Sequence, residues 1–179
     1  ADGTGRQHLQ ADGTISGAPQ RMVFNAPPGR LDVRVAIEAA ANGETIDREL
    51  LNVDIPDLTA AVALSTPRVY AVGTANEFRT IAADPGAVPT ARREFLRTER
   101  LLIRLDAYGA SGDGAVTAAV VNWAGERLTG VGVQRAGAGG THQISLPVGS
   151  LAPGEYAVEI TVTGESGQAR ELVPLRVGT

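Results

Sequence analysis

Residues with the chemistry of an active site are few in this chain. The histidines are His8 and His142, and neither lies in the G-x-S-x-G turn that presents a nucleophilic serine. Two isolated histidines do not form a metal cluster. Cysteine is absent, which excludes disulfides, thiolate zinc sites and cysteine nucleophiles. The residue set predicts a protein that is not an enzyme and binds no cofactor or metal.

Two acidic pairs have a spacing that would suit general acid–base chemistry. They are Asp54 with Asp57, and Asp106 with Asp113. Aspartates at such positions more often form turns or point outward from strands. We therefore interpret both pairs as structural.

The densest group of charges is a series of arginines, which would suit an anionic ligand such as phosphate. Glu94 and Glu99 lie within the series, Phe95 is its one aromatic residue, and the whole chain carries a net charge of −4. A solvated face is therefore favoured, and nucleic acid is not an expected partner. Arg93, Arg97 and Arg100 remain candidates for an interaction. The series is Arg92, Arg93, Arg97, Arg100 and Arg104.

Two aromatic residues are candidates for contact with a ligand. Trp123 follows an alternating apolar stretch, which predicts packing in the core, although β-sandwich lectins use exposed tryptophan against sugars. Tyr108 closes the preceding alternating stretch. These two residues keep carbohydrate binding open as an alternative function.

The elements that would position these side chains are β-strands. Apolar and polar residues alternate along each stretch, and turn residues separate the stretches at the spacing of about 8–12 residues that is typical of a sandwich. The chain is thus predicted to be all-β, with an immunoglobulin-like β-sandwich of about seven strands. The predicted strands in its second half are 101–108, 116–123, 128–135, 142–146, 154–162 and 169–177.

A Pro-Gly turn that leads into an alternating strand occurs twice. The first is PPGRLDVRVAI at 27–37 and the second is APGEYAVEITV at 152–162, and each is followed by Arg-Glu-Leu, at 48–50 and 170–172. Both segments are predicted to be the final hairpin of a sandwich module. In the first, a short strand is expected at 21–24 before the Pro-Gly turn, and Asn42-Gly43 is predicted to form the hairpin turn. Tyr156 is expected to place its ring at the edge of the core and its hydroxyl on a backbone partner, whereas Leu31 takes its place in the first copy.

The two copies predict an unequal domain organisation. Residues 1–57 would form a partial sandwich module, 58–98 a strand-containing linker, and 99–179, with a strand from 62–82, a complete sandwich. In the first module Ile46, Leu50 or Leu51, Val53 and Ile55 are the expected core residues of the returning strand. Its unpaired strand edges predict a protein partner, another domain of the same polypeptide, or self-association.

Composition and hydropathy indicate the general class of the protein. The chain is 43% hydrophobic, which is typical of a globular protein, and it contains no apolar run near the length of about 18 residues that a membrane span needs. It starts at Ala-Asp-Gly without a basic and apolar leader, so we expect it to be an excised segment of a longer protein.

Several of these segments resemble a known family. PGRLDVRV at 28–35, VDIPDL at 53–58, REFLRTERLLIR at 93–104 and LAPGEY at 151–156 are similar to the region that follows the von Willebrand factor A-type domain in exported bacterial VWFA-related proteins of the Acidobacteria type. The resemblance implies export to the periplasm or the cell exterior, a β-rich C-terminal region, and an upstream A-type domain with its own metal loop. The expected function is a non-enzymatic scaffold or protein-interaction module of a larger protein, and the alternative is a carbohydrate-binding or accessory domain of a secreted hydrolase.

Overall fold

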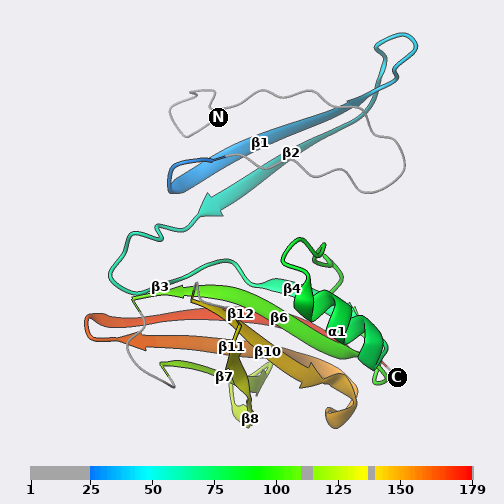
Figure 1. Cartoon of the computed structure of the whole chain (residues 1–179). Coiled ribbons are helices and arrows are strands. Elements are labelled where there is room, and N and C mark those ends of the chain that lie inside the picture. Colours follow the sequence, from blue (N-terminus) through cyan, green and yellow to red (C-terminus); the bar gives the residue numbers. More distant parts are fainter. Residues whose placement is uncertain (1–24, 110–114, 137–139, 179) are drawn as a thin grey trace. The chain divides into compact units, whose positions relative to one another are not determined.

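The structure is a computed structural model that describes residues 25–109, 115–136 and 140–178. The chain divides into two compact units, Ala1–Asp57 and Leu58–Thr179. Strands form most of the described residues (Figure 1), so the prediction of an all-β, sandwich-type fold is confirmed. The short strand expected at 21–24 lies outside the described residues.

In the first unit the described residues form one antiparallel hairpin, made of β1 (Gly29–Glu38) and β2 (Thr45–Ile55). The connecting turn is closed by a hydrogen bond of 2.8 Å from the N–H of Ala39 to the carbonyl of Glu44. Gly43 adopts a φ of +70°, a conformation that favours glycine. The turn predicted at Asn42-Gly43 is therefore present, and β2 ends just before Pro56, as expected for a residue that lacks an N–H donor.

The second unit is a sandwich of two five-stranded sheets, where the sequence predicted about seven strands in all. One sheet has the order β3-β6-β10-β9, and β4 also pairs with β6. The other has the order β5-β12-β11-β7-β8, in which only β5 runs parallel to its neighbour. The strands are β3 (Ala63–Leu64), β4 (Arg68–Val72), β5 (Glu94–Phe95), β6 (Arg100–Tyr108), β7 (Val116–Asn122), β8 (Arg127–Val131), β9 (Val133–Arg135), β10 (Thr141–Pro147), β11 (Gly154–Gly164) and β12 (Gly167–Val177).

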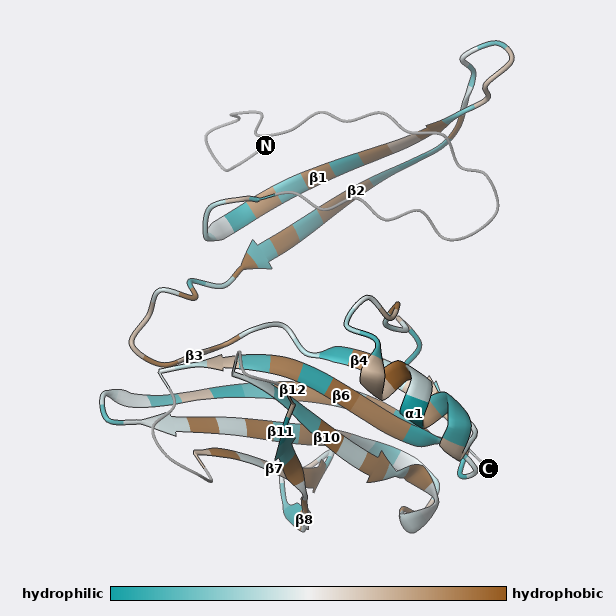
Figure 2. Cartoon of the chain, in the orientation of Figure 1, coloured by the Kyte–Doolittle hydropathy of each residue, from teal (hydrophilic) through white to brown (hydrophobic). Residues whose placement is uncertain are grey.

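The core lies between these two sheets. Leu101, Ile103 and Leu105 of β6 face it from one side, and Val158 and Ile160 of β11 face it from the other. All are branched aliphatic residues, which compensates for the small number of aromatic side chains. The alternation predicted along these strands thus corresponds to an inner and an outer face, as the hydropathy colours along β11 show (Figure 2).

The single α-helix among the described residues, α1 (Ala75–Ala83), was not predicted from the sequence; a short 3-10 helix, η1 (Val148–Ser150), follows β10. Thr74 and Glu77 form a capping box at its start, because the Thr74 hydroxyl accepts from the N–H of Glu77 and the Glu77 carboxylate accepts from the N–H of Thr74. The helix lies over the β4–β6 strands (Figure 1), and its apolar side chains Phe78, Ile81 and Ala82 pack against Tyr70, Val72 and Leu102. Within the described residues no helix is both long and apolar enough to cross a membrane.

Two boundaries differ from the sequence-based expectation. The segment 58–98, expected to be a strand-containing linker that gives the sandwich one strand from 62–82, supplies β3, β4, β5 and α1 to it. The segment 128–135, expected to be one strand, is two strands in different sheets: β8 pairs with β7, and β9 pairs with β10. Gly132 separates them, which allows the chain to leave one sheet and enter the other.

Candidate functional site

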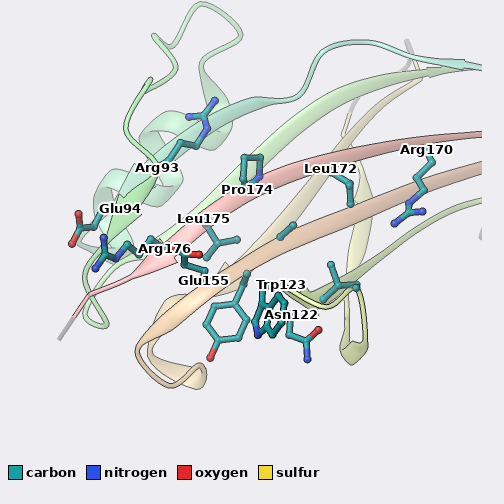
Figure 3. A pocket seen from close by; sticks show the side chains of 14 residues that line it. Arg93, Glu94, Asn122, Trp123, Glu155, Arg170, Leu172, Pro174, Leu175 and Arg176 are labelled. Atoms are coloured by element: carbon teal, nitrogen blue, oxygen red, sulfur yellow. The ribbon is translucent and has the colours of Figure 1, made fainter.

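The outer face of the β12–β11–β7 strands carries an open groove of about 580 Å³, whereas in the opposite sheet α1 covers the outer face of β4 and β6. Figure 3 shows Trp123 beside Asn122 in this groove, with Arg170 at one end and Arg176 and Glu94 at the other. We call it the outer groove. Its lining residues are Arg93, Glu94, Val121, Asn122, Trp123, Gly125, Glu155, Tyr156, Ala157, Arg170, Leu172, Pro174, Leu175 and Arg176.

Trp123 is not a core residue, contrary to the expectation from the alternating stretch before it. The strand β7 ends at Asn122, so Trp123 stands in the turn and is 86% exposed. Asn122 fixes this turn, because its side-chain carbonyl accepts from the N–H groups of Ala124 at 3.0 Å and Glu126 at 2.9 Å. Gly125 supports the turn with a φ of +81°. The indole is therefore held in solvent by a well-bonded turn.

The floor of the outer groove is apolar and shallow. Pro174, Ala157 and Val121 lie opposite one another on three adjacent strands, and all three contribute to the lining. Ala157 in the middle is small, which leaves space between Trp123 on one side and Leu172 on the other. A flat ring that stacks on the indole would rest on this floor.

Charged groups stand at both ends of the outer groove. Arg170 forms an ion pair with Glu159 at one end. At the other, Glu155 of β11 lies directly opposite Arg176 of β12. Arg93 lies there too and donates to the backbone carbonyls of Thr90 and Arg92, at 3.2 and 3.0 Å. Donors and acceptors are thus available around an aromatic platform, which is an arrangement for binding polar ligands.

Tyr156 contributes to both the groove and the core. Its ring is half-buried against the core, and its hydroxyl donates to the carbonyl of Ala152 at 3.0 Å. The prediction of a ring at the core edge with a backbone partner for the hydroxyl is confirmed. The sequence did not indicate that the same ring also lines the outer groove.

The other predicted interaction residues do not join Trp123. Tyr108 is 39% exposed at the end of β6, in the other sheet. Arg97 donates to the carbonyl of Gly149 at 3.2 Å, and Arg100 donates to the Ser145 hydroxyl at 2.9 Å. Of the five candidates, only Trp123 and Arg93 line the outer groove.

The arginine series is not one solvated face. Arg104 is buried, and its guanidinium donates to the carbonyls of Asp84, at 2.7 Å, and Ile81, at the C-terminal end of α1. It also lies over the ring of Tyr70, 5.1 Å from the centroid. The Ile81 carbonyl also accepts from the N–H of Asp84, and a cation at this helix end is favoured by the negative end of the helix dipole. Arg104, which lies on β6, therefore holds the C-terminal end of α1 on the sheet through these hydrogen bonds.

Arg92 is also structural. It donates to the Glu99 carboxylate at 2.6 Å, and the N–H of Leu96 donates to the same carboxylate at 2.7 Å. Burial raises the pKa of Glu99, but the hydrogen bonds from Arg92 and Leu96 and the charge of Arg92 outweigh burial, so the pKa lies below its ordinary value. The ionised carboxylate holds the loop that leads into β6.

The histidine and aspartate candidates show structural contacts. His142 is buried, and its Nδ1 lies 2.8 Å from the carbonyl of Gly140, in agreement with a hydrogen-bonding role. Asp106 accepts from Thr141 at 2.6 Å and pairs with Arg68 at 3.4 Å. His8 and Asp113 lie outside the described residues, and among those described no group of three or more potential metal ligands occurs.

A second candidate surface is the apolar face of the β1–β2 hairpin. This hairpin has the same register as β11–β12. In the first hairpin Leu50 lies opposite Arg34, which is five residues after Gly29. In the second hairpin Leu172 lies opposite Glu159, which is five residues after Gly154. The two hairpins therefore align position by position. On β1–β2, the apolar residues at the positions equivalent to the core-facing side of β11–β12 form a surface that we call the hairpin apolar face. Its residues are Leu31, Val33, Val35, Ile37, Leu51, Val53 and Ile55.

Much of the hairpin apolar face is exposed. Val35 is 42% exposed, whereas its counterpart Ile160 is fully buried, and Leu51 is 40% exposed against 4% for Val173. The expectation that Ile46, Leu50 or Leu51, and Val53 form a core is therefore wrong for the structure of this unit. The residues alternate as a core strand does, but no second sheet covers them among the described residues.

The chain matches no protein-family model, and no curated protein is significantly similar to it.

Proposed function

We propose that this chain is a non-enzymatic interaction or scaffold module of a larger, exported protein. The observation that carries the proposal is the hairpin apolar face, on which Leu31 is buried but Val35, Ile37, Leu51 and Val53 are exposed. Its residues have the pattern of a sandwich core and the register of the buried hairpin β11–β12. Apolar surface of this kind is stabilised when another polypeptide removes it from water.

The finer features of the proposal have separate support. An immunoglobulin-like sandwich is favoured by two mainly antiparallel sheets and by the bond from the Tyr156 hydroxyl to the Ala152 carbonyl, which resembles the tyrosine corner of such domains. Relationship to VWFA-related proteins, and with it an extracellular or periplasmic location, rests on the sequence segments at 28–35, 53–58, 93–104 and 151–156.

The test uses two adjacent leucines on opposite faces of β2. A photo-crosslinking amino acid at Leu51 should form a defined crosslink to another polypeptide when the protein is expressed in its own host. The same substitution at Leu50, which is 58% exposed on the polar face, is the matched control. Equal crosslinking at both positions, or none at either, would contradict the proposal.

A second function, carbohydrate binding, is favoured by one specific observation: the exposed Trp123 beside the outer groove. Sugar rings stack on indole through their apolar faces, and their hydroxyls would meet Arg176 and Glu155 at the end of the groove. On a glycan array, Trp123→Ala should abolish binding. Tyr108→Ala, in the other sheet, should leave it unchanged, and loss of binding in both variants would indicate general misfolding instead.

A further inference from the structure

We propose that two copies of this chain associate through β1, which pairs antiparallel with β1 of the second copy around a two-fold axis at Val33. The result is a four-stranded sheet in the order β2-β1-β1-β2, with one continuous apolar face. This inference rests on the proposed function of the hairpin as an interaction surface, and it names the partner.

Among the described residues, the edge of β1 that faces away from β2 has no strand beside it, and the second hairpin indicates that a strand belongs there. In the second unit the equivalent strand, β11, pairs on that edge with β7, antiparallel from Tyr156 opposite Asn122 to Val162 opposite Val116. Among the described residues β1 pairs only with β2. An isolated two-stranded hairpin is at best marginally stable in water, and three or more strands are needed for stability.

The edge of β2 is less suited to pairing. Glu49 lies opposite Val35, and Asp47 lies opposite Ile37, so both carboxylates are on the hairpin apolar face. Charges that point to the apolar side are a known protection of edge strands. The apolar side of β1 carries no charge from Leu31 to Ile37. The equivalent edge of β12 is also little used, since β5 covers it only at Arg176 and Val177.

The charges on the polar face of β1 select a second copy and a register. With Val33 on the axis, Asp32 of each copy lies opposite Arg34 of the other, and Arg30 lies opposite Ala36. Leu31 then lies opposite Val35 on the apolar face. Opposite charges across strands stabilise a pair, and like charges destabilise it.

Three of the shifted registers bring like charges together. An axis at Asp32 places Arg30 opposite Arg34, an axis at Arg34 places that residue opposite itself, and an axis at Val35 places Asp32 opposite Glu38. An axis at Leu31 places Arg30 opposite Asp32, but it overlaps the two strands only over 29–33, whereas an axis at Val33 overlaps them over 29–37. Charge and length of overlap together therefore favour Val33, and the pairing is isologous, as a two-fold dimer requires.

The first experiment uses the absence of cysteine from the chain. In the proposed dimer the two copies of residue 33 face each other with Cα atoms about 4.5–5.5 Å apart, a distance that a disulfide spans. Mild oxidation of the full chain with Val33→Cys should give a covalent dimer. Val35→Cys is the matched control on the same strand and face, because its two copies would be about 13 Å apart at about 3.4 Å per residue. Equal dimer yields for the two variants would overturn the register.

The second experiment measures self-association by sedimentation as a function of concentration. Arg34→Glu and Asp32→Arg should each raise the dimer Kd about tenfold, equivalent to about 1.4 kcal/mol, and the double variant Asp32→Arg/Arg34→Glu should restore it. Hydrogen exchange of the β1 and β2 amides identifies a variant in which the hairpin itself has unfolded. A wild-type chain that stays monomeric at millimolar concentration, or a dimer insensitive to these charges, would overturn the proposal.

The outcomes separate this inference from the function on which it rests. A crosslink from Leu51 to a different protein, together with a strictly monomeric chain, would leave the interaction module intact and remove the self-pairing. If Leu51 forms no crosslink and the chain is strictly monomeric, both the proposed function and the self-pairing are contradicted.

Discussion

The hairpins β1–β2 and β11–β12 share a register, a Pro-Gly entry and an Arg-Glu-Leu segment, and they differ in what covers them. Ile160 is fully buried under the facing sheet, whereas Val35 at the equivalent position is 42% exposed. Burial is therefore not a property of the alternating pattern alone. The pattern determines which face is apolar, and the neighbouring strands determine whether that face becomes a core or an interface.

The largest expected difference is between matched core truncations. Ile160→Ala should lower the free energy of unfolding of the second unit by about 3 kcal/mol, because it leaves a cavity in a packed core. Val35→Ala should change hydrogen-exchange protection of the first hairpin by no more than about 0.5 kcal/mol in dilute monomer. Chemical denaturation and hydrogen exchange measure the two values. Similar costs at both sites would mean that the hairpin apolar face is covered in the isolated chain.

The second hairpin has a neighbouring strand, β5, which pairs with β12. The loop that follows β5 is stabilised by the ion pair between Arg92 and Glu99. Glu99→Gln should lower stability at neutral pH by about 1–3 kcal/mol. Because the folded pKa of Glu99 is lowered, its contribution is fully present above the unfolded value of about 4.3 and is lost as pH falls through the folded pKa.

Denaturation at a series of pH values measures this effect. The difference between wild type and Glu99→Gln should disappear in acid. Glu165→Gln, in the exposed turn between β11 and β12, is the control and should show no such dependence. A difference that is constant with pH would contradict the assigned role of the carboxylate.

A smaller effect on stability is expected at the start of β11, where Tyr156 stands at the position of Leu31 in β1. Tyr156→Phe removes the hydroxyl that donates to Ala152 and should cost about 1 kcal/mol, as measured by thermal denaturation. Leu31 occupies the same place in the first hairpin and has no hydroxyl to lose. A neutral Tyr156→Phe variant would show that the second copy, like the first, depends on apolar contact alone.

The smallest effect concerns a diagonal pair of charges. In the second hairpin Arg170 pairs with Glu159, whereas the equivalent residues of the first are Arg48 and Arg34, two like charges. Arg34→Glu should therefore stabilise the isolated hairpin by about 0.2–0.5 kcal/mol, measured by hydrogen exchange at low salt. Because the same variant is expected to weaken self-association, the comparison is made at a concentration at which both proteins are monomeric. A loss of hairpin protection under that condition would count against the aligned register.

Local residue chemistry accounted for most of the strands and turns. Alternation located β1, β2, β6, β7, β10, β11 and β12, and Asn-Gly and Pro-Gly located the turns, because these preferences act within a few residues. The helix α1 was missed although Thr74 and Glu77 carry the signal of a capping box. Part of the outer groove was predicted, because Trp123 and Arg93 were named as candidates for an interaction. Tyr156, Arg170 and Arg176 line the groove only because pairing of adjacent strands brings them close to these two residues.

The strand pattern, the repeated hairpin and the absence of thiol chemistry follow from residue type and short-range spacing alone. The burial of Arg104 beneath α1 and the exposure of Trp123 follow from the three-dimensional fold. These outcomes depend on which strands become neighbours and where each strand stops. The same physical reason separates the two hairpins, since an apolar face becomes a core only when another layer of the protein lies on it.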